Sequence, residues 1–118
     1  MEWDLVTQRN IQLFIRLAGL AHHPLAADMQ WRQAHYQTHL GYRHGRVSLC
    51  QLFPHSPFDK VRLLTLLSDW RPSAFYGIPQ RVFQVRKGLA ISCSPPPDSS
   101  AELWLQLHRR QIALMGSR

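Results

Sequence analysis

The clearest amphipathic pattern of the chain lies near its middle, over residues 56–70. Ser56 and Asp59 form a capping-box pattern, and Pro57 suits the first turn of a helix. Arg71 precedes a proline, which disfavours the helical conformation, so the helix ends there. The apolar positions follow the spacing of one helical face: Leu63, Leu66, Leu67 and Trp70. The pattern predicts a central amphipathic helix.

Alternating polar and apolar residues before this helix predict a β-hairpin. A two-residue turn at His44-Gly45 brings three apolar pairs onto one face: Tyr42 with Val47, Leu40 with Leu49, and Tyr36 with Phe53. A three-residue turn would instead set Leu40 opposite Ser48 and mix the two faces. The sequence therefore favours the two-residue turn.

A second hairpin is predicted after the helix, over residues 81–93. A three-residue loop, Arg86-Lys87-Gly88, gathers the large apolar residues on one face and uses Gly88 where a left-handed residue is needed. A two-residue turn at Lys87-Gly88 would set Val85 opposite Ala90. We therefore expect the pairs that the longer loop implies: Val85 with Leu89, Phe83 with Ile91, and Arg81 with Cys93.

Residues 3–20 predict an N-terminal helix. One face is formed approximately by Trp3, Val6, Asn10, Phe14, Leu17 and Leu20, and it is widened by Leu13 and Ile15. Gly19 and Pro24 mark the end of the helical pattern. Residues 21–29 are predicted as a loop.

A C-terminal helix is predicted after a proline-rich connector at Ser94–Asp98. Ser99 and Glu102 form a second capping box, and the helix continues to Met115. Its apolar residues surround more than one stripe: Leu103, Trp104, Leu105, Leu107, Ile112, Leu114 and Met115. Such a helix has two faces to bury. Either one meets the sheet and the other a partner, or the whole helix lies deep in the core.

These elements predict a single α+β domain over residues 1–118. Two antiparallel hairpins form a sheet with three helices, in the order α-β-β-α-β-β-α. A chain of 118 residues is long enough to bury one core.

Positive charge is concentrated in the middle of the chain. The formal net charge is +7, and residues 29–97 contain nine Lys or Arg against two Asp. A basic region of this kind attracts nucleic acid, anionic lipid or an acidic protein. A solvated surface rich in arginine is the alternative interpretation.

The sequence gives no sign of export or membrane insertion. Two cysteines, Cys50 and Cys93, are too few for a disulfide framework. No apolar run approaches the roughly 20 residues of a membrane span, and the first residues lack the layout of a signal peptide. We expect a protein of the reducing cytoplasm.

No catalytic or metal-binding motif stands out. His39 lies opposite Cys50 in the predicted hairpin, with His35 two positions away, but the short ligand spacings of zinc sites are missing. Cys93 falls on the apolar face, which predicts a buried and inert thiol. There is no Gly-rich phosphate loop or nucleophile elbow. We expect a protein that is not an enzyme and needs no cofactor.

The alternative to protein binding is a small basic nucleic-acid-binding protein. The middle of the chain mixes cations with aromatic rings: Arg32, Tyr36, Tyr42, Arg43, Arg46, Arg81, Phe83, Arg86 and Lys87. The expected register, however, places Tyr36, Tyr42 and Phe83 on the core face. Only the basic hairpin tips would remain to contact phosphate.

The predicted order of elements resembles the class I (effector-type) chaperones of bacterial type III secretion systems. The likeness extends over most of the chain: the helix opening at Glu2-Trp3-Asp4 and ending at Leu17–Leu20, the strand Val47–Cys50, the helix Leu63–Trp70, the strand Gly88–Ile91 and the helix Leu103–Leu114. Members of this family are small α/β proteins of the bacterial cytoplasm that support virulence. They dimerise and hold an extended segment of a secreted protein.

The resemblance implies roles for particular residues. The central helix would form the contact of a homodimer, or of a heterodimer with a sister chaperone, through Leu63, Leu66, Leu67 and Trp70. A segment of a secreted effector or secretion-apparatus protein would wrap around the sheet and fill apolar patches. We assign those patches to Trp31, Leu52, Phe75, Tyr76 and Trp104.

Overall fold

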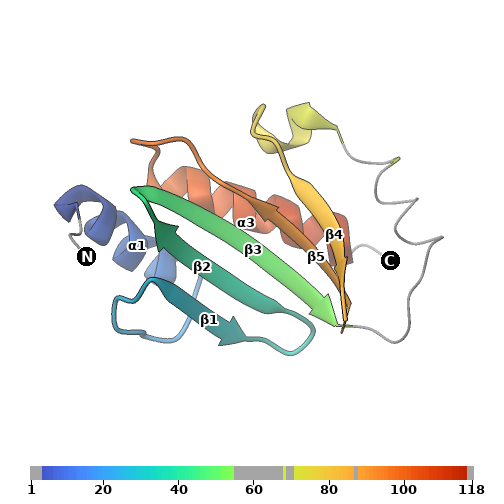
Figure 1. The fold of residues 1–118 in the computed structure, drawn as a ribbon, viewed down its shortest axis with the longest axis horizontal. Coiled ribbons are helices and arrows are strands. Elements are labelled where there is room, and N and C mark those ends of the chain that lie inside the picture. Colours follow the sequence, from blue (N-terminus) through green and yellow to red (C-terminus); the bar gives the residue numbers. More distant parts are fainter. Residues whose placement is uncertain (1–3, 55–67, 69–70, 87, 117–118) are drawn as a thin grey trace.

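Five antiparallel strands form one sheet, in the order β1-β2-β3-β5-β4 (Figure 1). The computed structural model describes residues 4–54, 68, 71–86 and 88–116. The strands are β1 (Asp28–Arg32), β2 (Gln37–Arg43), β3 (Arg46–Pro54), β4 (Arg81–Val85) and β5 (Gly88–Cys93). The helices are α1 (Leu5–Leu17), the short 3-10 helix η1 (Pro72–Phe75) and α3 (Ala101–Gly116). This arrangement confirms a small α+β fold.

The predicted register of the first hairpin is confirmed. Leu40 pairs with Leu49 across β2 and β3, and the turn has two residues. His44 and Gly45 both have positive φ, 53° and 74°, which matches the twist that a two-residue hairpin turn requires. Just before β2, the ring of Tyr36 stacks on that of Phe53 with 5.3 Å between centroids, although Tyr36 lies outside the strand.

The predicted register of the second hairpin is wrong by one residue. Phe83 pairs with Ala90, not Ile91, and Val85 pairs with Gly88. Gly88 is a strand residue without positive φ. The position needs glycine for lack of space, since a Cβ there would overlap the carbonyl oxygen of Phe53 on β3. Since side chains alternate along a strand, the shift moves Phe83 from the core face to the opposite face.

The sheet contains a strand beyond the two predicted hairpins. β1 begins at Asp28, inside the segment predicted as a loop, and pairs with β2. Met29 and Trp31 are buried while their neighbours are exposed, and the Trp31 indole N–H donates to the Ala21 carbonyl at 2.7 Å. Two apolar residues give too short an alternation for a firm sequence prediction. The expected order with two hairpins is therefore corrected.

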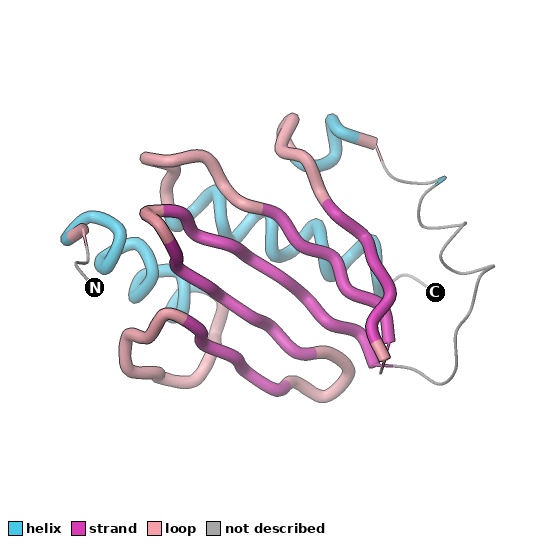
Figure 2. Tube along the Cα trace, in the orientation of Figure 1, coloured by secondary structure: helices cyan, strands magenta, loops and turns pink. Residues whose placement is uncertain are grey.

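Helices α1 and α3 pack on one face of the sheet (Figure 1 and Figure 2). Asp4 caps α1 by accepting from the Thr7 amide at 3.2 Å. The buried face of α1 is Ile11, Phe14 and Ile15. It confirms Phe14 and Ile15 from the predicted face, whereas Val6 and Leu17 are 61% and 40% exposed. Phe14 meets the ring of Trp104 on α3 edge-on, at 6.3 Å.

The cap of α3 lies one residue beyond the predicted Ser99. The Ser100 hydroxyl accepts from the Leu103 amide at 3.2 Å. The Ser99 hydroxyl instead donates to the Pro96 carbonyl at 2.6 Å and accepts from the Trp104 indole at 2.8 Å. The connector and the first turn of α3 are therefore fastened together.

A chain of buried polar side chains joins the sheet to α3. The Gln51 amide donates to His108 Nδ1 at 2.9 Å and to Gln111 Oε1 at 3.2 Å. Gln51 Oε1 accepts from the Thr38 hydroxyl at 2.7 Å, and the Gln111 amide donates to Gln80 Oε1 at 2.8 Å. All five side chains are buried. Each needs a partner there, because an unsatisfied buried amide costs about 1–3 kcal/mol.

The predicted central helix lies outside the described residues. Two long helices therefore belong to the described part of the fold, where three were expected for the whole chain. Within that part, the helices are too short or too polar to span a membrane.

Candidate functional site

The candidate site is the sheet face opposite α1 and α3, which we call the open face. Two rows of paired residues cross it: Arg81, Ser92, Cys50, His39 and Gln30 in the first, and Phe83, Ala90, Leu52, Gln37 and Arg32 in the second. Both helices lie behind the sheet in Figure 1, and no other helix of the described ranges lies over its front. The open face is therefore the broad surface on which a partner can lie.

An apolar ridge crosses the open face over three strands. Phe83 on β4 is 41% exposed, Leu52 on β3 is half-buried, and Ala90 on β5 lies between them, buried. A large aromatic side chain exposed on a strand is the kind of group that binding partners cover. The register error hid this ridge from the sequence analysis, because it placed Phe83 in the core.

The rest of the open face is basic. Arg32 and Arg81 are exposed at its two opposite edges, on β1 and β4. Arg43 forms an ion pair of 2.7 Å with Asp28, which is also exposed. The face therefore carries unbalanced positive charge, which attracts anionic groups of a partner.

The predicted juxtaposition of His39 and Cys50 is confirmed, since the two pair across β2 and β3. Burial lowers the pKa of the His39 imidazole, against an opposing effect of Asp28. Burial also raises the pKa of the Cys50 thiol to about 11, so at neutral pH it is a protonated thiol and a poor nucleophile. Residues that the structure describes include no cluster of three metal-binding side chains.

Cys93 lies on the helix-covered face of β5 and is buried, as predicted. Burial raises the pKa of its thiol to about 11. The Gln111 amide donates to its sulfur at 3.5 Å. Neither cysteine therefore has the lowered pKa of a catalytic thiol.

A hollow of about 480 Å³ adjoins the apolar ridge at the end of β4. It is lined by Arg46, Ser48, Pro79, Arg81, Ser92, Cys93 and Ser94. Two guanidinium groups and three serine hydroxyls thus surround a space open to solvent. We call it the arginine–serine hollow.

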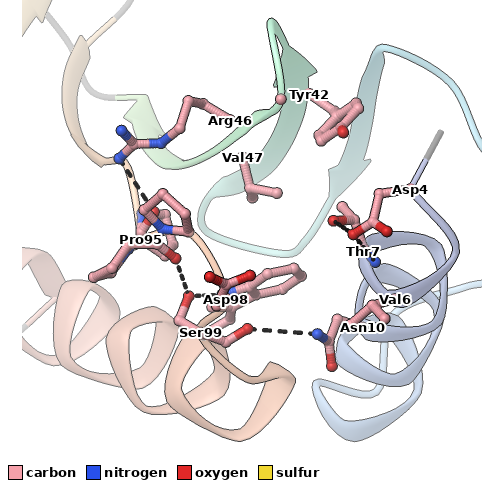
Figure 3. Close-up of a pocket in the computed structure, with 14 residues that line it drawn as sticks. Asp4, Val6, Thr7, Asn10, Tyr42, Arg46, Val47, Pro95, Asp98 and Ser99 are labelled. Atoms are coloured by element: carbon pink, nitrogen blue, oxygen red, sulfur yellow. Dashed lines mark hydrogen bonds between the residues drawn. The ribbon is translucent and has the colours of Figure 1, made fainter. Parts of the chain in front are cut away.

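A second pocket lies where α1, the β2–β3 turn and the proline-rich connector meet (Figure 3). Its volume is about 220 Å³. Arg46 donates to the Pro95 carbonyl at 3.3 Å and Asn10 to the Ser99 carbonyl at 3.4 Å. Because these polar groups bond to the chain itself, the pocket serves to hold three elements together.

Strand β4 forms one edge of the sheet and, among the described residues, pairs only with β5. Arg81, Phe83 and Gln84 are exposed along it. The edge of a sheet offers backbone groups to which another extended chain can pair. The β4 edge therefore lies next to both the apolar ridge and the arginine–serine hollow.

The residues assigned from the sequence to partner binding occupy different places. Trp31, Phe75 and Trp104 are buried in the core, with exposures of 7%, 1% and 4%. Leu52 lies on the open face. Tyr76 is 49% exposed and lies 5.8 Å below the guanidinium carbon of Arg110, away from the ridge. Of the five assigned residues, only Leu52 lies on the open face, in the same row as Phe83.

The residues assigned to a dimer contact lie outside the described residues: Leu63, Leu66, Leu67 and Trp70. Their role stays a prediction from the resemblance.

Comparison with known proteins identifies the family. The sequence profile of the SsaM family matches residues 4–117. The chain belongs to the SsaM family. A relative from Salmonella typhimurium, the secretion system apparatus protein SsaM, is 58% identical over 118 residues, which cover all of this chain and 97% of the relative. The expected link to bacterial secretion is confirmed at this level, whereas the chaperone class is not shown.

The fold also resembles a solved structure of distant sequence. YbjN from E. coli superposes with a TM-score of 0.52, covering 93% of this chain and 90% of that one, at 9% sequence identity. At this identity the likeness concerns the fold alone. It carries no information on nucleic-acid binding by this chain.

Proposed function

We propose that this chain is a non-catalytic component of a bacterial type III secretion system that binds a segment of another protein. The observation that carries the proposal is the exposed ring of Phe83 on the open face, on a strand, β4, that pairs only with β5 within the described ranges. Membership of the SsaM family supports the link to secretion. The protein would act in the bacterial cytoplasm.

The mechanism needs no covalent chemistry. An extended segment adds to the β4 edge through backbone hydrogen bonds, and every second side chain faces the ridge of Phe83 and Leu52. While it is bound, the segment cannot pair or fold elsewhere. This is the action of a chaperone on a secreted effector or on a secreted part of the apparatus.

We propose further that the chain works as a homodimer or as a heterodimer with a sister chaperone. Leu63, Leu66, Leu67 and Trp70 would form the contact. The amphipathic sequence pattern and the resemblance to class I chaperones support this assignment.

The first test is a charge inserted into the ridge. Phe83→Asp is expected to abolish complex formation with the partner, because it places a carboxylate in the apolar contact. The chain and the secretion-system proteins of its host are co-expressed pairwise, and complexes are measured by size-exclusion chromatography with light scattering. Val6→Asp is the matched control, since Val6 is 61% exposed on α1, behind the sheet.

Equal binding by Phe83→Asp and the parent would contradict the proposed surface. The chaperone role has its own readout. If the bound protein is exported and its export stops when this chain is deleted, the chaperone assignment holds. A partner that stays in the apparatus would instead make the chain a structural subunit.

The second test concerns the dimer. Leu66→Asp is expected to abolish self-association or pairing with the sister chaperone, because a buried charge in an apolar contact is strongly destabilising. Arg43→Glu is expected to leave it unchanged, since Arg43 is exposed and pairs only with the exposed Asp28 among the described residues. Light scattering over a range of concentrations measures both. A monomer at every concentration and with every candidate partner would contradict the proposal.

The Arg43→Glu variant also tests the competing hypothesis, that the chain binds nucleic acid. A loss of oligonucleotide binding in Arg43→Glu at low salt, measured by fluorescence anisotropy, would favour it.

A further inference from the structure

We propose that the partner segment is acidic, and that the arginine–serine hollow binds one of its carboxylate side chains next to an apolar side chain on Phe83. This inference rests on the proposed function and names the chemistry of the partner. It commits to a segment of another polypeptide as the occupant. The argument begins with the lining of the hollow.

The described lining of the hollow carries positively charged and hydroxyl groups. Arg81 provides an exposed guanidinium group, and Arg46 provides a second one, which also donates to the Pro95 carbonyl at 3.3 Å. Ser48 on β3 and Ser92 on β5 provide hydroxyl groups. Among the residues that the structure describes, its lining includes no Asp or Glu, and Asp28, the acidic residue of the open face in that part of the chain, is already paired with Arg43 at 2.7 Å. Guanidinium groups bind carboxylates through charge-assisted hydrogen bonds. The hollow therefore favours an anionic side chain.

The spacing along β4 connects the hollow to the ridge. Arg81 and Phe83 are alternate residues of the strand and face the same side of the sheet, so their Cα atoms lie roughly 7 Å apart. A segment paired with β4 has the same repeat. Directly opposed residues on one face interact, and opposite charges there are favourable. The segment is therefore expected to read acidic-x-apolar, with the acidic residue facing Arg81.

The exposed fractions of Phe83 and Arg81 suggest different roles in binding: the ridge contributes affinity, and Arg81 discriminates between acidic and neutral partners. Phe83 is 41% exposed and can lose further surface to a partner. Arg81 is exposed at the sheet edge, where charge pairs contribute modestly but discriminate between partners of opposite sign. Partners with apolar residues but no carboxylate at the right position should bind more weakly.

The test uses two synthetic peptides of about ten residues, the length of a long strand. Both carry a fluorescent label and the same Thr- and Leu-containing sequence, with Glu two residues from Leu in one and Gln in its place in the other. Binding to the full chain is measured by fluorescence anisotropy. We expect the Glu peptide to bind about two- to fivefold more tightly than the Gln peptide at low salt, as for an exposed charge pair. The difference should shrink as salt is added.

Variants assign the preference to the hollow. Arg81→Gln should lower the affinity for the Glu peptide to that for the Gln peptide. Arg9→Gln is the matched control, because Arg9 is exposed on α1 and loses the same charge; it should leave the preference unchanged. An equal loss in Arg9→Gln would show attraction by net charge only and overturn the inference. Circular dichroism verifies that each variant is folded.

Phe83→Ala separates this inference from the proposed function. It should weaken both peptides by the same factor. Suppose that Phe83→Ala weakens both peptides but the parent binds the Glu and Gln peptides equally. The inference of an acidic partner is then wrong, whereas the proposed binding surface is supported. If Phe83→Ala changes nothing, or if the parent binds neither peptide, the surface itself is wrong and the inference falls with it.

A cross-linking experiment tests whether a molecule other than the peptide occupies the surface around Phe83. Benzoylphenylalanine in place of Phe83 is illuminated with the Glu peptide present. A cross-link to the peptide supports the inference, whereas a cross-link to a second copy or within the same chain overturns it. Displacement of the peptide by an oligothymidine of equal length and charge, at lower concentration, would assign the hollow to phosphate and also overturn it.

Discussion

At the scale of single residues, the polar chain between the sheet and α3 has the largest consequence. Gln51 and Gln111 have no exposed surface, and their amides can be satisfied in only one relative position of sheet and helix. His108 Nδ1 accepts from Gln51 at 2.9 Å. A neutral imidazole fits this position. In a protonated imidazole, Nδ1 would carry a hydrogen that points at the donating amide of Gln51.

The first residue-scale prediction is a loss of stability in acid. Burial, with a smaller contribution from the charge of Arg109, lowers the pKa of His108 from 6.5 to about 4. Between these values the unfolded chain binds a proton that the folded chain does not, so the free energy of unfolding falls as the pH drops below 6.5 towards 4. The shift corresponds to about 3 kcal/mol in this window. Urea denaturation at a series of pH values measures it.

His108→Gln is the comparison, because the amide oxygen keeps an acceptor for Gln51 and does not titrate. Between pH 6.5 and 4, the free energy of unfolding should decrease in both proteins, but by about 3 kcal/mol less in His108→Gln than in the parent. Parallel pH profiles for the two proteins would show that His108 does not titrate as described.

At the scale of elements, two glycines that both face β3, Gly41 on β2 and Gly88 on β5, show what fixes the sheet. A Cβ on Gly88 would meet backbone atoms of β3, with the Pro54 Cα at 2.8 Å. A Cβ on Gly41 would meet the hydroxyl of Ser48 at 2.7 Å, at the end of a side chain that can rotate. Backbone cannot yield as a side chain can, so Gly88 sets the close approach of β5 to β3.

The element-scale prediction compares Ala at these two positions. Gly88→Ala should lower the free energy of unfolding by about 1–3 kcal/mol or more, the range of overpacking. Gly41→Ala should change it by less than about 1 kcal/mol, because Ser48 rotates away. Thermal and urea denaturation of both variants measure the difference. A Gly88→Ala protein as stable as the parent would contradict the close approach.

The second hairpin also shows why its element was predicted and its register was not. Val82 and Phe83 are adjacent apolar residues, so the strand lacks a clear alternation and either of its sides could face the core. The prediction gave Gly88 a turn role. In the fold, Gly88 is a residue of β5, and glycine is required there because β3 leaves no room for a Cβ. That contact joins residues far apart in the sequence, and no local pattern reveals it.

At the scale of the whole molecule, the two faces of the sheet differ in how they are covered. α1 and α3 cover one face of the sheet, and the described residues place no helix on the other (Figure 2). Strands β2, β3 and β5 each have a neighbour on both sides, whereas β1 and β4 form the edges. Stability is therefore expected to decrease from the centre of the sheet outward.

The whole-molecule prediction concerns hydrogen exchange. Amides of β3 and β5 should exchange slowest, and those of β1 and β4 faster by about a hundredfold, because edge strands open without unfolding the core. Native-state exchange followed by mass spectrometry measures this order. A β4 strand as protected as β5 in the isolated protein would mean that its edge is already covered. Slower exchange in β4 on adding a partner would support the proposed binding edge.

The sequence by itself determined the features that depend on neighbours along the chain. The His44-Gly45 turn, the pairing of Leu40 with Leu49 and the two terminal helices follow from turn chemistry and periodicity, which act over a few residues. The α+β class and the link to secretion were also predicted from the order of elements. The buried position of Cys93 followed from its place in an apolar strand.

Only the tertiary structure decided which aromatic residues are free to meet a partner. Trp31 and Trp104 became core residues because their indole N–H groups found partners at Ala21 and Ser99, and Phe83 became exposed through a one-residue change of register. Which side of a strand is buried depends on distant elements that pack against it. Burial is a property of the whole fold, and so the candidate binding surface could be located only in three dimensions.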